Sequence, residues 1–144
     1  MTDITVRPAR ADEAEQLATW AEAMAWETEH KRLEPATVRR GVRGVFEQPG
    51  RGRYFIAERQ GEPAGTLMHT YEWSDWRDGD WWWIQSVYVA PAHRRQGVYA
   101  AMHAHLVALA KASEKPRSTC RRVPLKTAQS CPLLKISIKT APTA

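Results

Sequence analysis

Residues 87–102, which read VYVAPAHRRQGVYAAM, pass from a strand through a short basic loop into a helix. The residues just before the loop, 81–89, are rich in aromatic and β-branched side chains and predict a strand. The residues after it, 98–113, are rich in Ala, Met and Leu, which are strong helix formers. Pro91 restricts the backbone between the two, so the sequence predicts a strand, a loop and a helix in direct succession.

The loop has the composition of an anion-binding site. The first N–H groups of a helix are unpaired and carry partial positive charge, which favours a bound anion. Gly97 has no side chain to keep a phosphate from the backbone, and Arg94 and Arg95 add donors that suit phosphate oxygens. Two linked phosphates suit this arrangement better than a single carboxylate. The alternative is a turn glycine beside solvated arginines, and the flanking strand and helix favour the anion site over it.

The rest of the sequence predicts helices packed on a mostly antiparallel sheet. Alternating polarity marks the strands and helical spacing marks the helices: strands over 4–8, 54–58 and 66–73, and helices over about 13–27 and from 35 to the break at 48–52. Asp12 and Glu15 resemble a capping box at the start of the first helix. This order of elements predicts an α+β fold in α/β layers.

The spacing of Arg94, Gly97 and Tyr99 resembles a pattern of the GNAT N-acetyltransferase family. That pattern is Arg or Gln, two residues, Gly, one residue, then Gly or Ala, between a strand and a helix. Tyr99 departs from it, so its ring must point away from the phosphates. The order of elements over residues 4–113 is similar as well. The resemblance implies a GNAT-like acyl-CoA N-acyltransferase fold that moves acetyl from acetyl-CoA to a primary amine of a small molecule or peptide.

The same resemblance implies which residues hold the acetyl-CoA. Backbone groups of Val87 and Val89 would pair with the pantetheine arm, and the N–H of Tyr88 or Val89 would polarise the thioester carbonyl. Gln85 is expected to share a face with Val87 and Val89, because strand side chains alternate. Backbone N–H groups of the loop would hold the pyrophosphate: Arg94, Arg95, Gln96, Gly97, Val98 and Tyr99. No catalytic residue is assigned, and we expect the base to be an ordered water or a carboxylate from elsewhere.

Several aromatic residues are candidates for the acceptor site. Trp73 and Trp76 flank a polar loop and suit an aromatic wall around an amine, whereas Trp81 and Trp83 are expected to pack in the core. Trp26 and Glu27 end the first helix, and Glu27 is a candidate to hold a cationic amine. The alternative for Glu27 is a solvated residue at a helix end.

The character of the chain changes after Glu114. All 16 acidic residues lie at or before it, whereas 7 of the 21 Lys and Arg follow it. We therefore expect a domain over 1–114 whose C-terminal part is incomplete, and an atypical basic tail over 115–144 that is disordered or forms one strand within 133–139. The change motivates the hypothesis of a shifted reading frame near Lys115, which resequencing would test. It also keeps open a degenerate, non-catalytic acyl-CoA-binding module.

Composition excludes several other classes. The formal charge of +5 belongs to the tail, which has no interleaved aromatic residues, so we expect no nucleic-acid partner. No apolar run is long enough to span a membrane and no signal peptide is recognisable, so we expect a cytoplasmic protein with no membrane partner. Cys120 and Cys131 lack zinc-ligand spacing, and no metal site is expected. An unpaired sheet edge would allow a homodimer.

Overall fold

The computed structural model describes residues 3–76, 78–113 and 134–136. Short 3₁₀ turns at 11–13, 49–51 and 91–93 join the larger elements. In chain order these elements are β1 (Ile4–Pro8), α1 (Ala14–Glu29), α2 (Pro35–Glu47), β2 (Gly52–Arg59), β3 (Glu62–Ser74), β4 (Gly79–Val89), α3 (Val98–Ser113) and β5 (Leu134–Ile136).

The strands form one sheet in the order β1-β2-β3-β4-β5. The first four are antiparallel, with Val6 opposite Ala57 and Leu67 opposite Val87. β5 runs parallel to β4. The prediction of a mostly antiparallel sheet with helices packed on it is confirmed.

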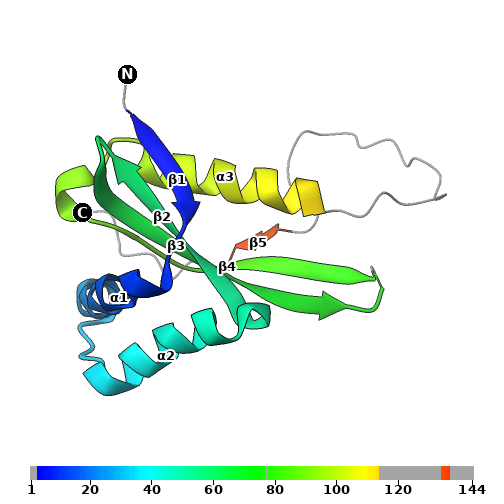
Figure 1. The fold of residues 1–144 in the computed structure, drawn as a ribbon, viewed down its shortest axis with the longest axis horizontal. Helices are drawn as coiled ribbons and strands as arrows, with labels where there is room; N and C mark the ends of the chain where they lie inside the picture. The colour runs from blue at the N-terminus through cyan, green and yellow to red at the C-terminus, as the bar shows by residue number, and fades with distance from the viewer. Residues whose placement is uncertain (1–2, 77, 114–133, 137–144) are drawn as a thin grey trace.

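The sheet is the middle of three layers (Figure 1). Helix α3 covers one face, where four of its residues spaced one turn apart are buried against the strands: Val98, Met102, Leu106 and Ala110. Helices α1 and α2 cover the other face, where Leu17 and Val42 meet Ile56 and Tyr88 of the sheet. The strand–loop–helix unit therefore crosses from the central layer to an outer one.

The two N-terminal helices begin in different ways. Pro35 occupies the first turn of α2, and the Glu34 carboxylate accepts hydrogen bonds from the N–H groups of Ala36 and Thr37 at 3.1 and 2.6 Å. For α1 the predicted pair of Asp12 and Glu15 is wrong. The Glu13 carboxylate instead accepts the Arg10 N–H at 2.7 Å, and Glu15 pairs with arginines of α2.

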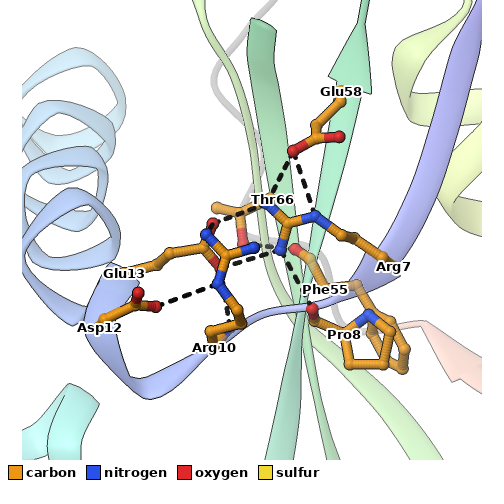
Figure 2. A network of polar contacts seen from close by, with 8 residues as sticks. All are labelled: Arg7, Pro8, Arg10, Asp12, Glu13, Phe55, Glu58 and Thr66. Carbon is orange, nitrogen blue, oxygen red and sulfur yellow. Dashed lines mark hydrogen bonds and ion pairs between the residues drawn. The ribbon is translucent and has the colours of Figure 1, made fainter. Parts of the chain in front are cut away.

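An arginine on β1 fastens the start of α1 to the sheet (Figure 2). Arg7 Nη2 lies 2.6 Å from Glu13 and 2.7 Å from Glu58 on β2, and its Nε donates to Glu58 at 3.1 Å. The Arg7 guanidinium holds the pKa of Glu13 down to about 2, because charge-assisted hydrogen bonds favour the ionised carboxylate. These contacts join β1 and the turn before α1 to β2, where Glu58 lies 51 positions from Arg7 in the sequence.

The C-terminal segment is described only in part. The strand predicted within 133–139 is present as β5, which pairs Leu134 with Trp82 and Ile136 with Ile84. The other features predicted for 115–144, including the altered reading frame near Lys115, lie outside the described residues. The domain boundary after Glu114 stays a prediction.

Candidate functional site

A β-bulge in the middle of β4 sets the directions of the side chains around the site. Met68 pairs with Ser86 and His69 with Ile84, so Gln85 is an extra residue without an opposite partner on β3. Ile84 and Val87 therefore both face α3, while Gln85 and Ser86 line a cavity on the opposite face. The prediction that Gln85 shares the face of Val87 and Val89 is wrong, because the extra residue reverses the alternation.

Beyond the bulge, β4 has an open edge. Within the described part of the chain, β5 pairs only with Trp82, Trp83 and Ile84, and no strand pairs with residues 85–89 on that side. The Ala90 N–H donates to Ala64 O on the β3 side at 2.8 Å. Backbone groups alternate along an antiparallel ladder, so those of Tyr88 point to β3 and those of Val87 and Val89 point to the open edge. Of the two N–H groups predicted to polarise the thioester, only that of Val89 therefore lies on this edge.

The loop after β4 turns sharply into α3. Arg95 and Gly97 both have positive φ, 61° and 84°, and the Ala101 N–H makes an early bond of the helix to Gly97 O at 3.0 Å. A Cβ built on Gly97 would meet no atom within 4 Å. The glycine is therefore required by the backbone angle, and the space beside it is open. The N–H groups of the first helical turn follow directly after this open space.

Arg94 is turned toward α1. Its Nε donates to Val89 O at 2.9 Å, its Nη2 donates to the Glu27 carboxylate at 2.7 Å, and its guanidinium lies 5.7 Å from the centre of the Tyr88 ring. One predicted cofactor residue and one predicted acceptor residue are thus joined by an ion pair. Arg95 and Gln96 are exposed at the tip of the loop.

Tyr99 occupies the position where the sequence departs from the family pattern. Its ring lies 5.9 Å from that of His103, one helical turn further along α3, and burial raises the pKa of its phenol. The ring therefore lies along the flank of the helix, and the expectation that it points away from the phosphates stays a prediction.

A cavity of about 650 Å³ lies on the other face of the sheet, between α1, α2 and the strands. Such a volume is typical of small-molecule sites. The cavity reaches the bulge of β4, and burial raises the pKa of Tyr54 in its wall. It is lined by Ala21, Met24, Val38, Gly41, Val42, Val45, Tyr54, Met68, Thr70, Trp83, Gln85 and Ser86.

The four predicted acceptor residues lie outside this lining. Trp73 and Trp76, near the end of the β3–β4 hairpin, are 62% and 95% exposed. Trp26 is 47% exposed and lies under the Arg32 guanidinium, 4.9 Å from it, while Glu27 contacts Arg94. Their role in acceptor binding stays a prediction.

Trp83 is predicted to pack in the core, but Trp82 is the buried residue of this aromatic run. Trp82 stacks on His69 at 4.5 Å between ring centres, whereas Trp83 is half-buried and lines the cavity. The other lining residues have no chemical signature in the sequence. Glycine in α2 was the one available signal, because it weakens a helix, but the sequence does not distinguish Gly41, which lines the cavity, from Gly44, which does not.

Within residues 3–76, 78–113 and 134–136, no group of three or more His, Cys, Asp or Glu side chains is arranged to hold a metal ion. None of the described helices combines the length and apolar character needed to cross a bilayer.

The chain is similar to known proteins in both sequence and structure. The sequence matches the model of the acetyltransferase (GNAT) family over residues 11–132, a range that includes β4, the loop and α3. A possible acetyltransferase from Clostridium difficile 630 is 33% identical to this chain, with a TM-score of 0.72, and the match covers 75% of this chain and 71% of that one. No curated protein sequence matches the chain.

Two further solved structures share the fold. One is a predicted acetyltransferase with acetyl-CoA from Clostridium acetobutylicum, with 17% identity, a TM-score of 0.62 and coverage of 76% of this chain and 74% of that one. The other is the ribosomal-protein-alanine N-acetyltransferase from Brucella melitensis biovar Abortus 2308, with 14% identity, a TM-score of 0.59 and coverage of 78% and 73%.

Proposed function

The chain belongs to the GNAT acetyltransferase family, and from that premise we propose that it transfers acetyl from acetyl-CoA to a primary amine held in the cavity between α1, α2 and the sheet. One observation carries this proposal. The open edge of β4 and the cavity meet at the bulge, where Gln85 and Ser86 line the cavity and the edge continues to Val87 and Val89. A donor along the edge and an acceptor in the cavity would meet at one place.

The residues present suit acetyl-CoA, the acyl donor of this family. The open space at Gly97 and the N–H groups at the start of α3 suit the pyrophosphate. The outward backbone groups of Val87 and the Val89 N–H suit the amides of the pantetheine arm. When bound, acetyl-CoA supplies an acetyl group activated as a thioester. Val89 O already accepts a hydrogen bond from Arg94 Nε. We therefore assign two roles to Arg94: its hydrogen bond shapes the loop, and its positive charge favours a bound anion.

The chain's own contribution to the reaction is orientation and desolvation. Ser86, Gln85 and Thr70 offer oxygen acceptors to an amine N–H, while the apolar walls disfavour an ammonium ion. Removing an amine from water lowers its pKa and so increases the uncharged fraction that has a free lone pair. Holding that amine at the bulge would bring it near the acyl donor and raise the rate by proximity.

A second candidate is a degenerate acyl-CoA-binding module, and one observation favours it. None of the described residues that line the cavity is an Asp, a Glu or a His. The cavity wall therefore offers none of the carboxylate or imidazole side chains that commonly act as general bases. A module of this kind would bind acetyl-CoA and release no acetylated product.

Calorimetric titration with acetyl-CoA tests the cofactor site. We expect saturable binding to the wild type and a loss of at least about a hundredfold in affinity for Gly97→Glu, because the carboxylate places bulk and negative charge where phosphates should lie. Gly97→Ala is the matched control, since it carries the same backbone strain without the charge and should lose far less. Equal binding by the wild type and Gly97→Glu would contradict the proposed site.

Mass spectrometry of reactions with acetyl-CoA and a panel of primary amines then separates the two candidates. An acetylated amine supports the transferase. Saturable acetyl-CoA binding with no product from any amine supports the degenerate module.

A further inference from the structure

We infer that the acceptor is a primary amine carried by an uncharged, apolar body, of the arylalkylamine class, rather than a polyamine, an amino sugar or a peptide side chain among charges. This inference rests on the proposed function and deepens it. It follows from the chemistry of the cavity walls, the open position at Gly41 and the place of Gln85.

The walls are apolar on the helical side. Six of the lining residues come from α1 and α2, and none carries a polar side chain: Ala21, Met24, Val38, Gly41, Val42 and Val45. On the sheet side, Met68 adds a flexible thioether and Trp83 and Tyr54 add aromatic faces. Methionine and aromatic side chains together suit a flat apolar group, because the thioether is polarisable and adapts its shape.

The polar groups of the cavity gather at one end. Gln85 and Ser86 lie at the bulge of β4, and Thr70 lies on β3. All three are uncharged donors and acceptors, which suit one amine nitrogen. An acceptor in this space would therefore place its nitrogen near the bulge and its apolar body toward α1 and α2.

The lining residues carry no charged side chain, and this disfavours amines that carry a second charge. A second ammonium group of a polyamine would lie against the apolar side chains of Met24, Val38 or Val42 without a carboxylate partner among the lining residues, and even partial burial of an unpaired charge is unfavourable. Glu72 accepts a hydrogen bond from Trp83 Nε1, but it is exposed and does not line the cavity. The walls therefore select against charge away from the reacting nitrogen.

Gly41 determines how much space the body of the acceptor has. It lies within α2, lines the cavity, and a Cβ built on it would meet no atom within 4 Å. A larger side chain at this position would enter the open space next to Gly41 without a clash at its Cβ. Gly41 is thus a specificity-determining residue on this inference, and it can be replaced without disturbing the buried core.

The test measures ligand binding directly, by tryptophan fluorescence, since Trp83 lines the cavity. The probes are phenethylamine, putrescine and a short N-acetylated peptide in which one lysine lies between charged residues. We expect phenethylamine to bind at least about tenfold more tightly than either of the others. Gly41→Leu should weaken phenethylamine by at least about tenfold and leave acetyl-CoA binding unchanged. Equal or tighter binding of putrescine or the peptide, or no binding of phenethylamine, would overturn the inference.

Two further variants separate specificity from general damage. Gly50→Leu replaces another glycine with open space around it, away from the cavity, and should bind phenethylamine as the wild type does. Gln85→Glu adds a carboxylate of the same size at the bulge and should shift the preference toward putrescine. A Gly50→Leu variant that binds as weakly as Gly41→Leu, or a Gln85→Glu variant with unchanged preference, would contradict the assignment of the cavity.

Acetylation of the same three amines distinguishes failure of this inference from failure of the proposed function. Acetyl transfer to putrescine or the peptide but not to phenethylamine would overturn the acceptor class and leave the transferase intact. Specific phenethylamine binding with no acetylation of any amine would overturn the transferase and leave the cavity assignment standing.

Discussion

The two faces of the sheet are covered to different degrees. On the α3 face, Leu67, Ile84 and Leu106 are completely buried. On the α1 and α2 face, Leu17 and Ile56 are buried near the start of α1, but a cavity of about 650 Å³ separates the helices from the far part of the strands. The difference shows that packing is continuous on the α3 face, whereas on the other face it is interrupted by a cavity.

The means of attachment differ as well. Helix α3 is held by apolar packing along its whole inner face. Helices α1 and α2 are held partly by apolar contacts and partly by charged side chains: Arg7 with Glu13 joins the start of α1 to the sheet, and Arg39 with Glu15 joins α2 to α1. We therefore expect the α3 face to be sensitive to lost volume and buried charge, and the other face to tolerate changes along its cavity.

The largest expected effect is truncation on the α3 face. Leu106→Ala should lower the free energy of unfolding by about 2–5 kcal/mol, because it leaves a void among packed side chains. Val38→Ala, on the half-buried wall of the cavity, should cost under about 1 kcal/mol, because the space beside it is already open. Urea denaturation of both variants measures this contrast, and equal losses would remove the distinction between the faces.

A histidine buried on the α3 face should make that face sensitive to acid. Burial, with the nearby Arg53, lowers the pKa of His69 from 6.5 to about 4, and the ring packs among Phe55, Tyr71 and Trp82. The unfolded chain binds this proton near pH 6.5 and the native state only near pH 4. Stability is therefore complete above pH 6.5 and should fall by up to about 3 kcal/mol as the pH drops to 4.

The variant His69→Phe isolates that contribution. Its unfolding free energy should change less than that of the wild type between pH 6.5 and 4. Parallel pH profiles for the two proteins would show that the buried ring does not control acid stability.

A smaller effect is expected where α1 is fastened to the sheet. Glu13→Gln should lower stability by about 1–2 kcal/mol at neutral pH, because it removes a carboxylate bonded to Arg7. The pKa of Glu13 is lowered from 4.5 to about 2, so its contribution is present above pH 4.5 and is lost as the pH falls toward 2.

Thermal unfolding of wild type and variant across this range gives the measurement. Asp12→Asn is the control, since its pair with Arg10 is mostly exposed and should contribute almost nothing. If Asp12→Asn destabilised the protein as much as Glu13→Gln, the special role of the Arg7 network would be refuted.

The smallest expected effect has the opposite sign. Gly41→Ala should raise stability by about 0.5–1 kcal/mol, because alanine favours a helix and its Cβ enters open space. Gly65→Ala should instead destabilise, since its Cβ would lie 2.7 Å from Tyr88 O. Chemical denaturation compares the two, and destabilisation by Gly41→Ala would show that the cavity wall is more tightly packed than the structure has it.

Features that depend on neighbouring residues could be predicted from the sequence. The run of aromatic and β-branched residues before Pro91, and the Ala-rich run after Gly97, favour a strand and a helix through local backbone and side-chain preferences. The order of elements and the loop at 94–99 follow from these preferences. The positive φ of Gly97 shows that the glycine lies in a turn, whereas its role in the close approach of a phosphate stays a prediction.

Features that depend on contacts between distant residues were decided by the tertiary structure. The bulge at Gln85 arises in the pairing of β4 with β3, and alternation along a single strand contains no sign of it. The ion pair of Glu27 with Arg94 joins residues 67 positions apart. The cavity is lined by side chains from two helices and three strands. In the sequence, the apolar residues among them cannot be distinguished from residues of a packed core. The sequence therefore determined the elements and the position of the loop after β4, whereas the cavity exists only because packing leaves that space unfilled.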